Sequence, residues 1–118
     1  MKRWMKWMGV AVACGLLAGH VQAGERAAVV MGTATPGGGF EFFGKALAEG
    51  VNAADASLEV TARSTRGSSE NIPLLEEGKL DVALVASLPA REAFEGIDRD
   101  GPTPLKIITA IYPTFGAF

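Results

Sequence analysis

Two spacings of apolar residues alternate along the chain, and its first unit shows both. Residues 27–31 form a continuous apolar run that ends at Gly32, which is typical of a strand buried on both faces. After a loop over 33–39, apolar side chains recur with the spacing of one helical face, at Phe40, Phe43, Leu47 and Val51. Glu41 and Lys45 stand four residues apart on another face and add a weak supporting pair.

A second unit repeats this order of strand, loop and helix. Residues 58–63 alternate between apolar and polar side chains, and residues 64–69 form a polar loop. Pro73 has no backbone N–H, so we expect the following helix to begin within about four residues of it, with Ser68 or Ser69 as the cap. Gly78 suits the end of this helix.

The remaining elements continue the alternation. Residues 81–86 predict a third strand, 89–94 a short helix and 105–112 a fourth strand, with turn residues over 96–104. Strands that alternate with helices indicate an α/β fold with a mostly parallel sheet and flanking helices.

Ligands of such folds bind beyond the carboxyl ends of the strands. The loops of interest are therefore 33–39, 64–69 and 86–88, all of them small, polar or rich in glycine.

The first 23 residues predict a cleavable signal peptide. Lys2, Arg3 and Lys6 precede an apolar run over 8–18, which is too short to span a bilayer as a helix. Small residues at Val21 and Ala23 predict cleavage after Ala23 and a protein in the periplasm. Lipidation at Cys14 and an uncleaved anchor are the alternatives.

Composition narrows the chemistry of the remaining 95 residues. They carry eight Lys and Arg against thirteen Asp and Glu, which argues against nucleic acid as a partner. The only Cys and the only His of the chain, Cys14 and His20, lie in the predicted signal. Without them, we expect no disulfide, no Cys-His or Ser-His-Asp catalysis and no zinc site of the usual ligands. The composition does not exclude catalysis that uses only Asp and Glu side chains.

The glycine-rich first loop invites a nucleotide-binding interpretation, but neither common motif is complete. The dinucleotide motif needs a glycine where Phe42 stands, and the phosphate-loop motif has Ala46 where Ser or Thr should bind magnesium. No cofactor is therefore expected. Gly37, Gly38 and Gly39 are also explained by a tight turn alone, and a small nucleotide-binding α/β domain stays an alternative.

The second loop suits an anion. Its hydroxyl groups and backbone N–H groups come just before a predicted helix, where the helix dipole favours a negative charge such as a carboxylate. Capping alone also explains Ser68 or Ser69. Arg63 and Arg66 either pair with a ligand carboxylate or stay solvated, and solvation is the simpler interpretation. No facing pair of carboxylates for a glycosidase is evident along Glu70, Glu76, Glu77 and Asp81.

Two blocks carry a family resemblance: GTATPGGGFEFFGKALAEGVN over 32–52 and STRGSSENIPLLEEGKLDVALV over 64–85. Together they resemble the TAXI family of periplasmic solute-binding proteins, which serve TRAP-type secondary transporters, and the likeness extends over 29–112. The resemblance implies that residues 24–118 are part of lobe 1 of a type II periplasmic binding protein fold. It also implies a receptor rather than an enzyme, with a small carboxylate as ligand (a dicarboxylate, an oxo acid, or an acidic or amide amino acid) and the TRAP membrane permease subunits as partners.

The resemblance also assigns ligand-binding positions. The first loop contributes Thr33 and Thr35, the first helix Phe42 and Phe43, and the later loops Ser64, Thr65, Gly67, Ser68 and Ser87. Two departures from the family matter, because many relatives have Tyr in the aromatic pair and Gln after the third strand. Here Phe43 and Ala86-Ser87 stand there, which removes a hydroxyl and an amide.

Length is a further departure, because family members are longer and form two lobes around the ligand. The chain is therefore expected to be an N-terminal fragment, with a truncated and nonfunctional product as an alternative. A part of one lobe would leave apolar surface uncovered, so we expect poor ligand binding and aggregation.

Overall fold

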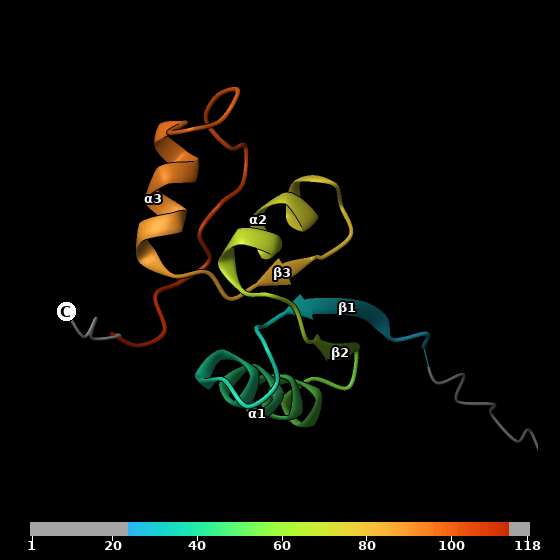
Figure 1. Cartoon of the computed structure of the whole chain (residues 1–118). Coiled ribbons are helices and arrows are strands. Elements are labelled where there is room, and N and C mark those ends of the chain that lie inside the picture. Colours follow the sequence, from blue (N-terminus) through green and yellow to red (C-terminus); the bar gives the residue numbers. More distant parts are fainter. Residues whose placement is uncertain (1–23, 114–118) are drawn as a thin grey trace, which may run out of the picture.

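The computed structural model describes residues 24–113, in which strands and helices alternate (Figure 1). The predicted signal peptide lies outside the described residues. The elements are β1 (Ala27–Gly32), α1 (Gly39–Ala54), β2 (Leu58–Arg63), α2 (Ser68–Glu76), β3 (Val82–Ala83) and α3 (Ser87–Glu95). None of the described helices is both long and apolar enough to cross a bilayer.

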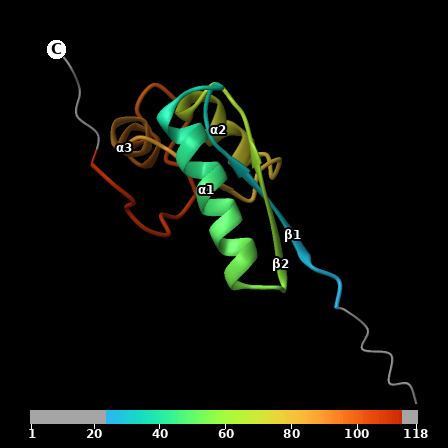
Figure 2. The ribbon, with the colours of Figure 1, turned by 90° about the horizontal axis from the view of Figure 1, so that it is seen from below.

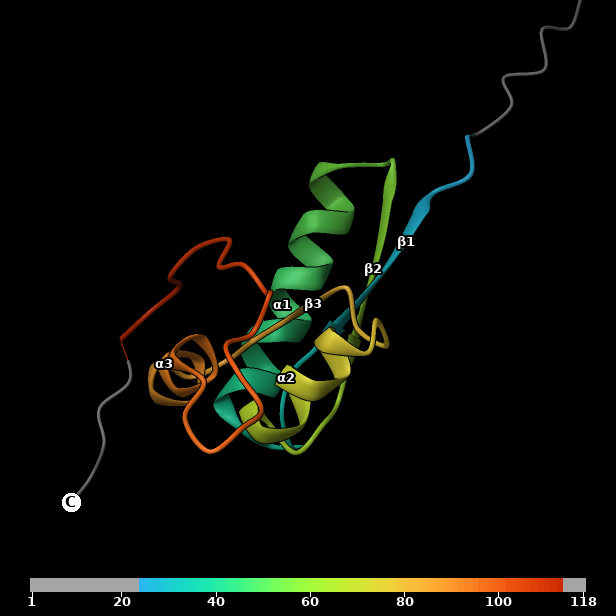
Figure 3. The same ribbon diagram turned by 90° about the horizontal axis from the view of Figure 1, so that it is seen from above.

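The sheet has three parallel strands in the order β2-β1-β3. The pairing of β1 with β2 runs from Ala27 opposite Leu58 to Gly32 opposite Arg63. Helix α1 covers one face, and α2 and α3 lie on the other side, as Figures 1 and 3 show. The chain therefore leaves β1 toward one face and β3 toward the other. The carboxyl ends of these adjacent strands form a topological switch point, where α/β folds bind ligands.

The core lies between α1 and the sheet, and Figure 2 shows from below how α1 runs along β1 and β2. Met31, Ala48 and Val60 are buried at its centre, and Leu47 and Val51 of the predicted helical face pack around them. The apolar spacing along α1 therefore identified the part of the face that meets the sheet, while its first two residues, Phe40 and Phe43, pack against Tyr112.

The outer edge of the sheet is covered by a side chain of α1. Asn52 accepts a hydrogen bond from the Val60 N–H at 2.7 Å and donates one to the Val60 carbonyl at 2.9 Å. Because β2 is an edge strand, these two backbone groups would otherwise be free to pair with a strand of another chain, and the Asn52 amide prevents this.

Three predicted features differ in the structure. The first two residues of β1, Ala27 and Ala28, are exposed, so only its carboxyl half is buried. The third strand contains two residues instead of six. Residues 105–112 form no strand, and Ile107 and Ile108 in this segment are exposed. A strand needs a partner backbone as well as apolar side chains, and this segment makes no ladder with the short β3.

The start of α2 also differs from the prediction. Gly67, at a φ of +88°, is the cap residue, and neither Ser68 nor Ser69 caps the helix. The Ser68 hydroxyl instead accepts a hydrogen bond from the Ala86 N–H at 2.9 Å. The other end is as expected: α2 stops at Glu76, and Gly78 has the left-handed conformation, with a φ of +67°, that follows many helices.

Candidate functional site

The loops that follow the three strands meet at the carboxyl edge of the sheet, as predicted from the α/β pattern. The Thr65 N–H donates to the Ala34 carbonyl at 3.2 Å, which joins the loops after β1 and β2. The bond between Ala86 and Ser68 joins the loops after β2 and β3. We call this region the loop edge, defined by residues 33–38, 64–68 and 84–88.

Two hydroxyl groups assigned to ligand binding are used inside the protein. Thr33 and Thr65 are both buried. Thr33 Oγ1 donates to the Arg63 carbonyl at 3.0 Å. Thr65 Oγ1 donates to the Thr33 carbonyl at 3.2 Å and accepts from the Gly67 N–H at 3.1 Å. Both residues therefore fix the shape of the loop edge, whatever contact they also make with a ligand.

Asn71 of α2 lies beneath the loop edge, a position that nothing in the sequence pattern indicated. Its side chain is fully buried, and Nδ2 donates to the carbonyls of Thr33 and Leu84, each at 2.8 Å. These carbonyls follow β1 and β3, so the amide joins the two strands at the switch point. Asn71 Oδ1 has no hydrogen-bond partner among the described residues and lies 2.6 Å from where a Cβ on Gly32 would stand. Glycine at position 32 therefore makes room for the amide.

Helices α1 and α2 begin with the same arrangement of glycine and glutamate. Each has a glycine cap, Gly38 or Gly67, without a side-chain capping bond. Three residues later a glutamate reaches back to the N–H before the cap: Glu41 accepts from Gly37 at 2.7 Å, and Glu70 accepts from Arg66 at 2.8 Å. Both helix starts therefore already carry a carboxylate of the chain itself.

These contacts stabilise the charged form of both glutamates. Hydrogen bonds from Lys45 and then from the Gly37 N–H hold the pKa of Glu41 below its ordinary value. Hydrogen bonds from the backbone and then the side chain of Arg66 lower the pKa of Glu70. The expected pair of Glu41 and Lys45 is present. The pair therefore helps to hold the Glu41 carboxylate at the start of α1, in addition to stabilising an exposed face of the helix.

The start of α3 carries no such carboxylate. Its cap is Ala86, its first turn has no acidic residue, and Pro89 supplies no N–H. Within the described residues, the N–H groups of Ser87 and Leu88 have no hydrogen-bond acceptor. Of the three helix starts at the loop edge, α3 is thus the one whose positive dipole end has no carboxylate of the chain itself.

The other assigned residues differ in exposure. Thr35, Ser64 and Ser87 are exposed at the loop edge, whereas Ser68 is half-buried and Gly67 is buried. On α1, Phe42 is 80% exposed, and Phe43 is half-buried against Tyr112. The structure brings these residues to one edge, and their contact with a ligand stays a prediction.

The two arginines of the second loop have different environments. Arg66 Nε lies 3.2 Å from Glu70 Oε2, so its charge is partly used within the chain. Arg63, at the carboxyl end of β2, is exposed and forms no ion pair with another described residue. Arg63 is therefore the better placed of the two to meet an anionic ligand.

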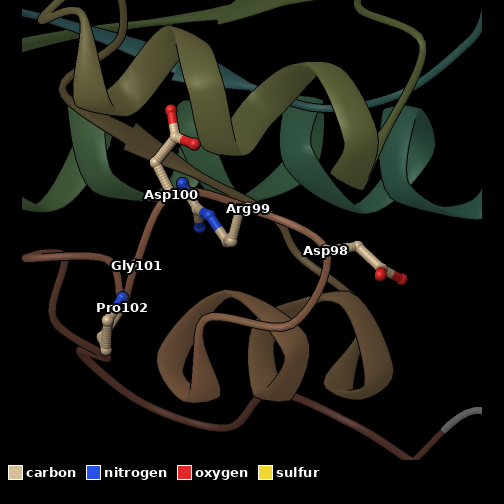
Figure 4. Close-up of a pocket in the computed structure, with 5 residues that line it drawn as sticks. All are labelled: Asp98, Arg99, Asp100, Gly101 and Pro102. Atoms are coloured by element: carbon tan, nitrogen blue, oxygen red, sulfur yellow. The ribbon is translucent and has the colours of Figure 1, made fainter.

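A separate hollow lies away from the loop edge, and its polar groups do not suit a carboxylate. It measures about 550 Å³ and is lined by residues 98–102, which follow the carboxyl end of α3. Figure 4 shows the carboxylates of Asp98 and Asp100 pointing in different directions. Arg99 in the same loop pairs with Glu76. The polar groups therefore do not converge there as they do at the loop edge.

Comparison with known families shows which family the chain belongs to. The sequence model of the NMT1-like family matches residues 31–118. The chain belongs to the NMT1-like family. This is a family of periplasmic binding proteins related to solute receptors. Searches of the curated proteins and of the solved structures found no significant match.

Membership confirms the coarser part of the expectation from the sequence. An NMT1-like protein is a solute-binding protein, and the three-stranded parallel sheet with flanking helices is the architecture of part of a lobe of such a receptor. The family is one of binding proteins rather than of enzymes. Assignment to the TAXI family stays a prediction.

Proposed function

We propose that this NMT1-like protein is an extracytoplasmic receptor that binds a small carboxylate and delivers it to a TRAP-type permease. The solute-binding role rests on the family. The carboxylate and the permease rest on the TAXI resemblance of residues 32–52 and 64–85. The periplasmic location rests on the predicted signal over 1–23.

The uncompensated start of α3 is the observation that carries the choice of ligand. The N–H groups of Ser87 and Leu88 and the exposed hydroxyl of Ser87 are hydrogen-bond donors, and the dipole of α3 adds a positive potential. Exposed Ser64 and Arg63 add further donors at the neighbouring loop. A carboxylate accepts up to four hydrogen bonds and matches this set.

We propose the start of α3, rather than the glycine-rich loop, as the position of the ligand carboxylate. Glu41 already occupies the start of α1, where a nucleotide phosphate would have to sit. Like charges would repel each other there. The nucleotide-binding alternative therefore finds no support in the geometry of the first loop.

Ser87→Pro tests the proposal with little disturbance of the fold. Proline is favoured at the first position of a helix, and Ala86 already has the extended conformation that proline requires of its predecessor. The substitution removes one N–H and one hydroxyl. We expect affinity for the bound carboxylate to fall about tenfold or more, because hydrogen bonds to charged groups are worth about 1.5–3 kcal/mol.

The measurement is calorimetric titration with succinate, 2-oxoglutarate, L-glutamate and L-glutamine, each carried to millimolar concentration because a part of one lobe is expected to bind weakly. Ser57→Ala is the control, because Ser57 is exposed and lies just before β2, at the opposite edge of the sheet. No binding of any of these compounds by the unaltered chain would refute the carboxylate. Equal affinity of the Ser87→Pro variant would refute its placement at α3.

A further inference from the structure

A tyrosine far along the chain lies beside the start of α1. The Tyr112 ring packs against Phe43, with 5.2 Å between ring centroids, and against Phe40 edge-to-face, with 6.2 Å. Elsewhere in the same segment, Ile107 and Ile108 are exposed by 68% and 82%. Tyr112 is exposed by 37% and thus anchors a segment that otherwise has little cover.

The aromatic contacts hold the ring and leave the hydroxyl available. Tyr112 Oη lies 4.0 Å from where a Cβ on Gly39, the first residue of α1, would stand. It forms no hydrogen bond with a described residue, and it is not among the buried polar atoms without a partner. Tyrosine combines an apolar ring with a polar tip, so a half-exposed Tyr at a binding region packs through the ring and recognises through the hydroxyl.

Tyr112 also supplies a hydroxyl group that the aromatic residues of α1 lack. The aromatic pair on α1, Phe42 and Phe43, has no hydroxyl, and Tyr112 is the only tyrosine of the chain. Its ring lies directly against Phe43 and therefore brings a phenolic oxygen to the aromatic face of α1.

We infer that Tyr112 is a specificity-determining residue of the proposed carboxylate site, whose hydroxyl accepts a hydrogen bond from a donor group of the ligand. This inference rests on the proposed function. Glu41 already accepts the Gly37 N–H at this helix start and pairs with Lys45, so this N–H is not left for a second carboxylate, and a ligand donor such as an ammonium or amide group is the better partner there. The carboxylate of the ligand then faces α3, and its donor group faces α1.

L-glutamate and glutarate form a matched pair of probes, because they differ only in the amino group. Tyr112→Phe removes the hydroxyl and keeps the ring contacts with Phe40 and Phe43. We expect the variant to bind L-glutamate about 3- to 10-fold more weakly, the range of one hydrogen bond, and to bind glutarate as before. Its melting temperature should be unchanged.

Each result decides the inference. Selective loss for L-glutamate supports it. Unchanged binding of both probes, or equal loss for both, overturns it while the proposed function stands. No binding of either probe or of any other tested carboxylate by the unaltered chain overturns the carboxylate proposal and this inference with it. A ¹³C-tyrosine spectrum gives a check without ligand, because the single signal should lose its ring-current shift in Phe43→Leu.

Discussion

Asn71 offers the sharpest test of how the loop edge is held together. Its amide donates two hydrogen bonds of 2.8 Å from a fully buried position. Asn71→Leu keeps the branch at Cγ and the number of side-chain heavy atoms, and it removes both donors. The Leu84 carbonyl then loses the side-chain bond that the structure gives it, whereas the Thr33 carbonyl keeps the weaker one from Thr65.

The expected loss of stability follows from these two carbonyls. An unsatisfied buried acceptor costs about 1–3 kcal/mol. The variant leaves the Leu84 carbonyl without its side-chain partner and the Thr33 carbonyl with one partner fewer, so the free energy of unfolding should fall by about 3 kcal/mol. That is a large share of the 5–15 kcal/mol typical of a folded domain. Asn71→Asp should cost more, because it turns a carboxylate oxygen toward the two carbonyl oxygens.

Urea unfolding followed by circular dichroism measures this loss. Asn52→Leu is the matched control, because its amide also makes two backbone bonds but at the outer edge of β2, where water can replace it. We expect a cost of about 1 kcal/mol for the control. Equal costs for the two variants would refute the conclusion that Asn71 is the buried link between β1 and β3.

Two further predictions concern α1. Gly50 is helical, and a Cβ there would meet nothing within 4 Å. Gly50→Ala should therefore raise the free energy of unfolding by about 1 kcal/mol in the same urea assay. A decrease would show that the space beside Gly50 is not open. Folding lowers the pKa of Glu41 below its ordinary value of about 4.5. The charged Glu41 therefore stabilises the fold fully above pH 4.5, and this stabilisation is lost as pH falls through the lower, folded-state pKa. Stability of Glu41→Gln measured between pH 7 and pH 3 should therefore fall less than that of the unaltered chain, and parallel curves would show that Glu41 contributes nothing.

The spacing of apolar residues predicted helices more reliably than strands. Leu47 and Val51 of the predicted helical face pack against the sheet, which confirms that part of the face, whereas Phe40 and Phe43 pack against Tyr112. Residues 105–112 have an equally apolar pattern and form no strand. The difference is physical: a helix makes its backbone hydrogen bonds internally, whereas a strand depends on a neighbour that its own sequence does not specify.

The site was predictable at the level of loops but not of atoms. Parallel α/β topology alone places the three loops at one edge. Whether a hydroxyl turns outward, as in Ser87, or bonds within the chain, as in Thr65, depends on contacts between loops. Asn71 escaped notice because a polar residue on a short helix is usually solvated, and only the tertiary packing against Gly32 shows that it is buried.

Amide NMR of the ¹⁵N-labelled chain titrated with L-glutamate, succinate and 2-oxoglutarate tests most directly that the loop edge is a carboxylate-binding site. We expect saturable shifts concentrated at Ser87 and Leu88, with smaller ones at Ser64 and Thr35, and none at Ser57 on the opposite edge. Shifts absent for every probe, or centred on residues 98–102 or on the edge around Ser57, would contradict it.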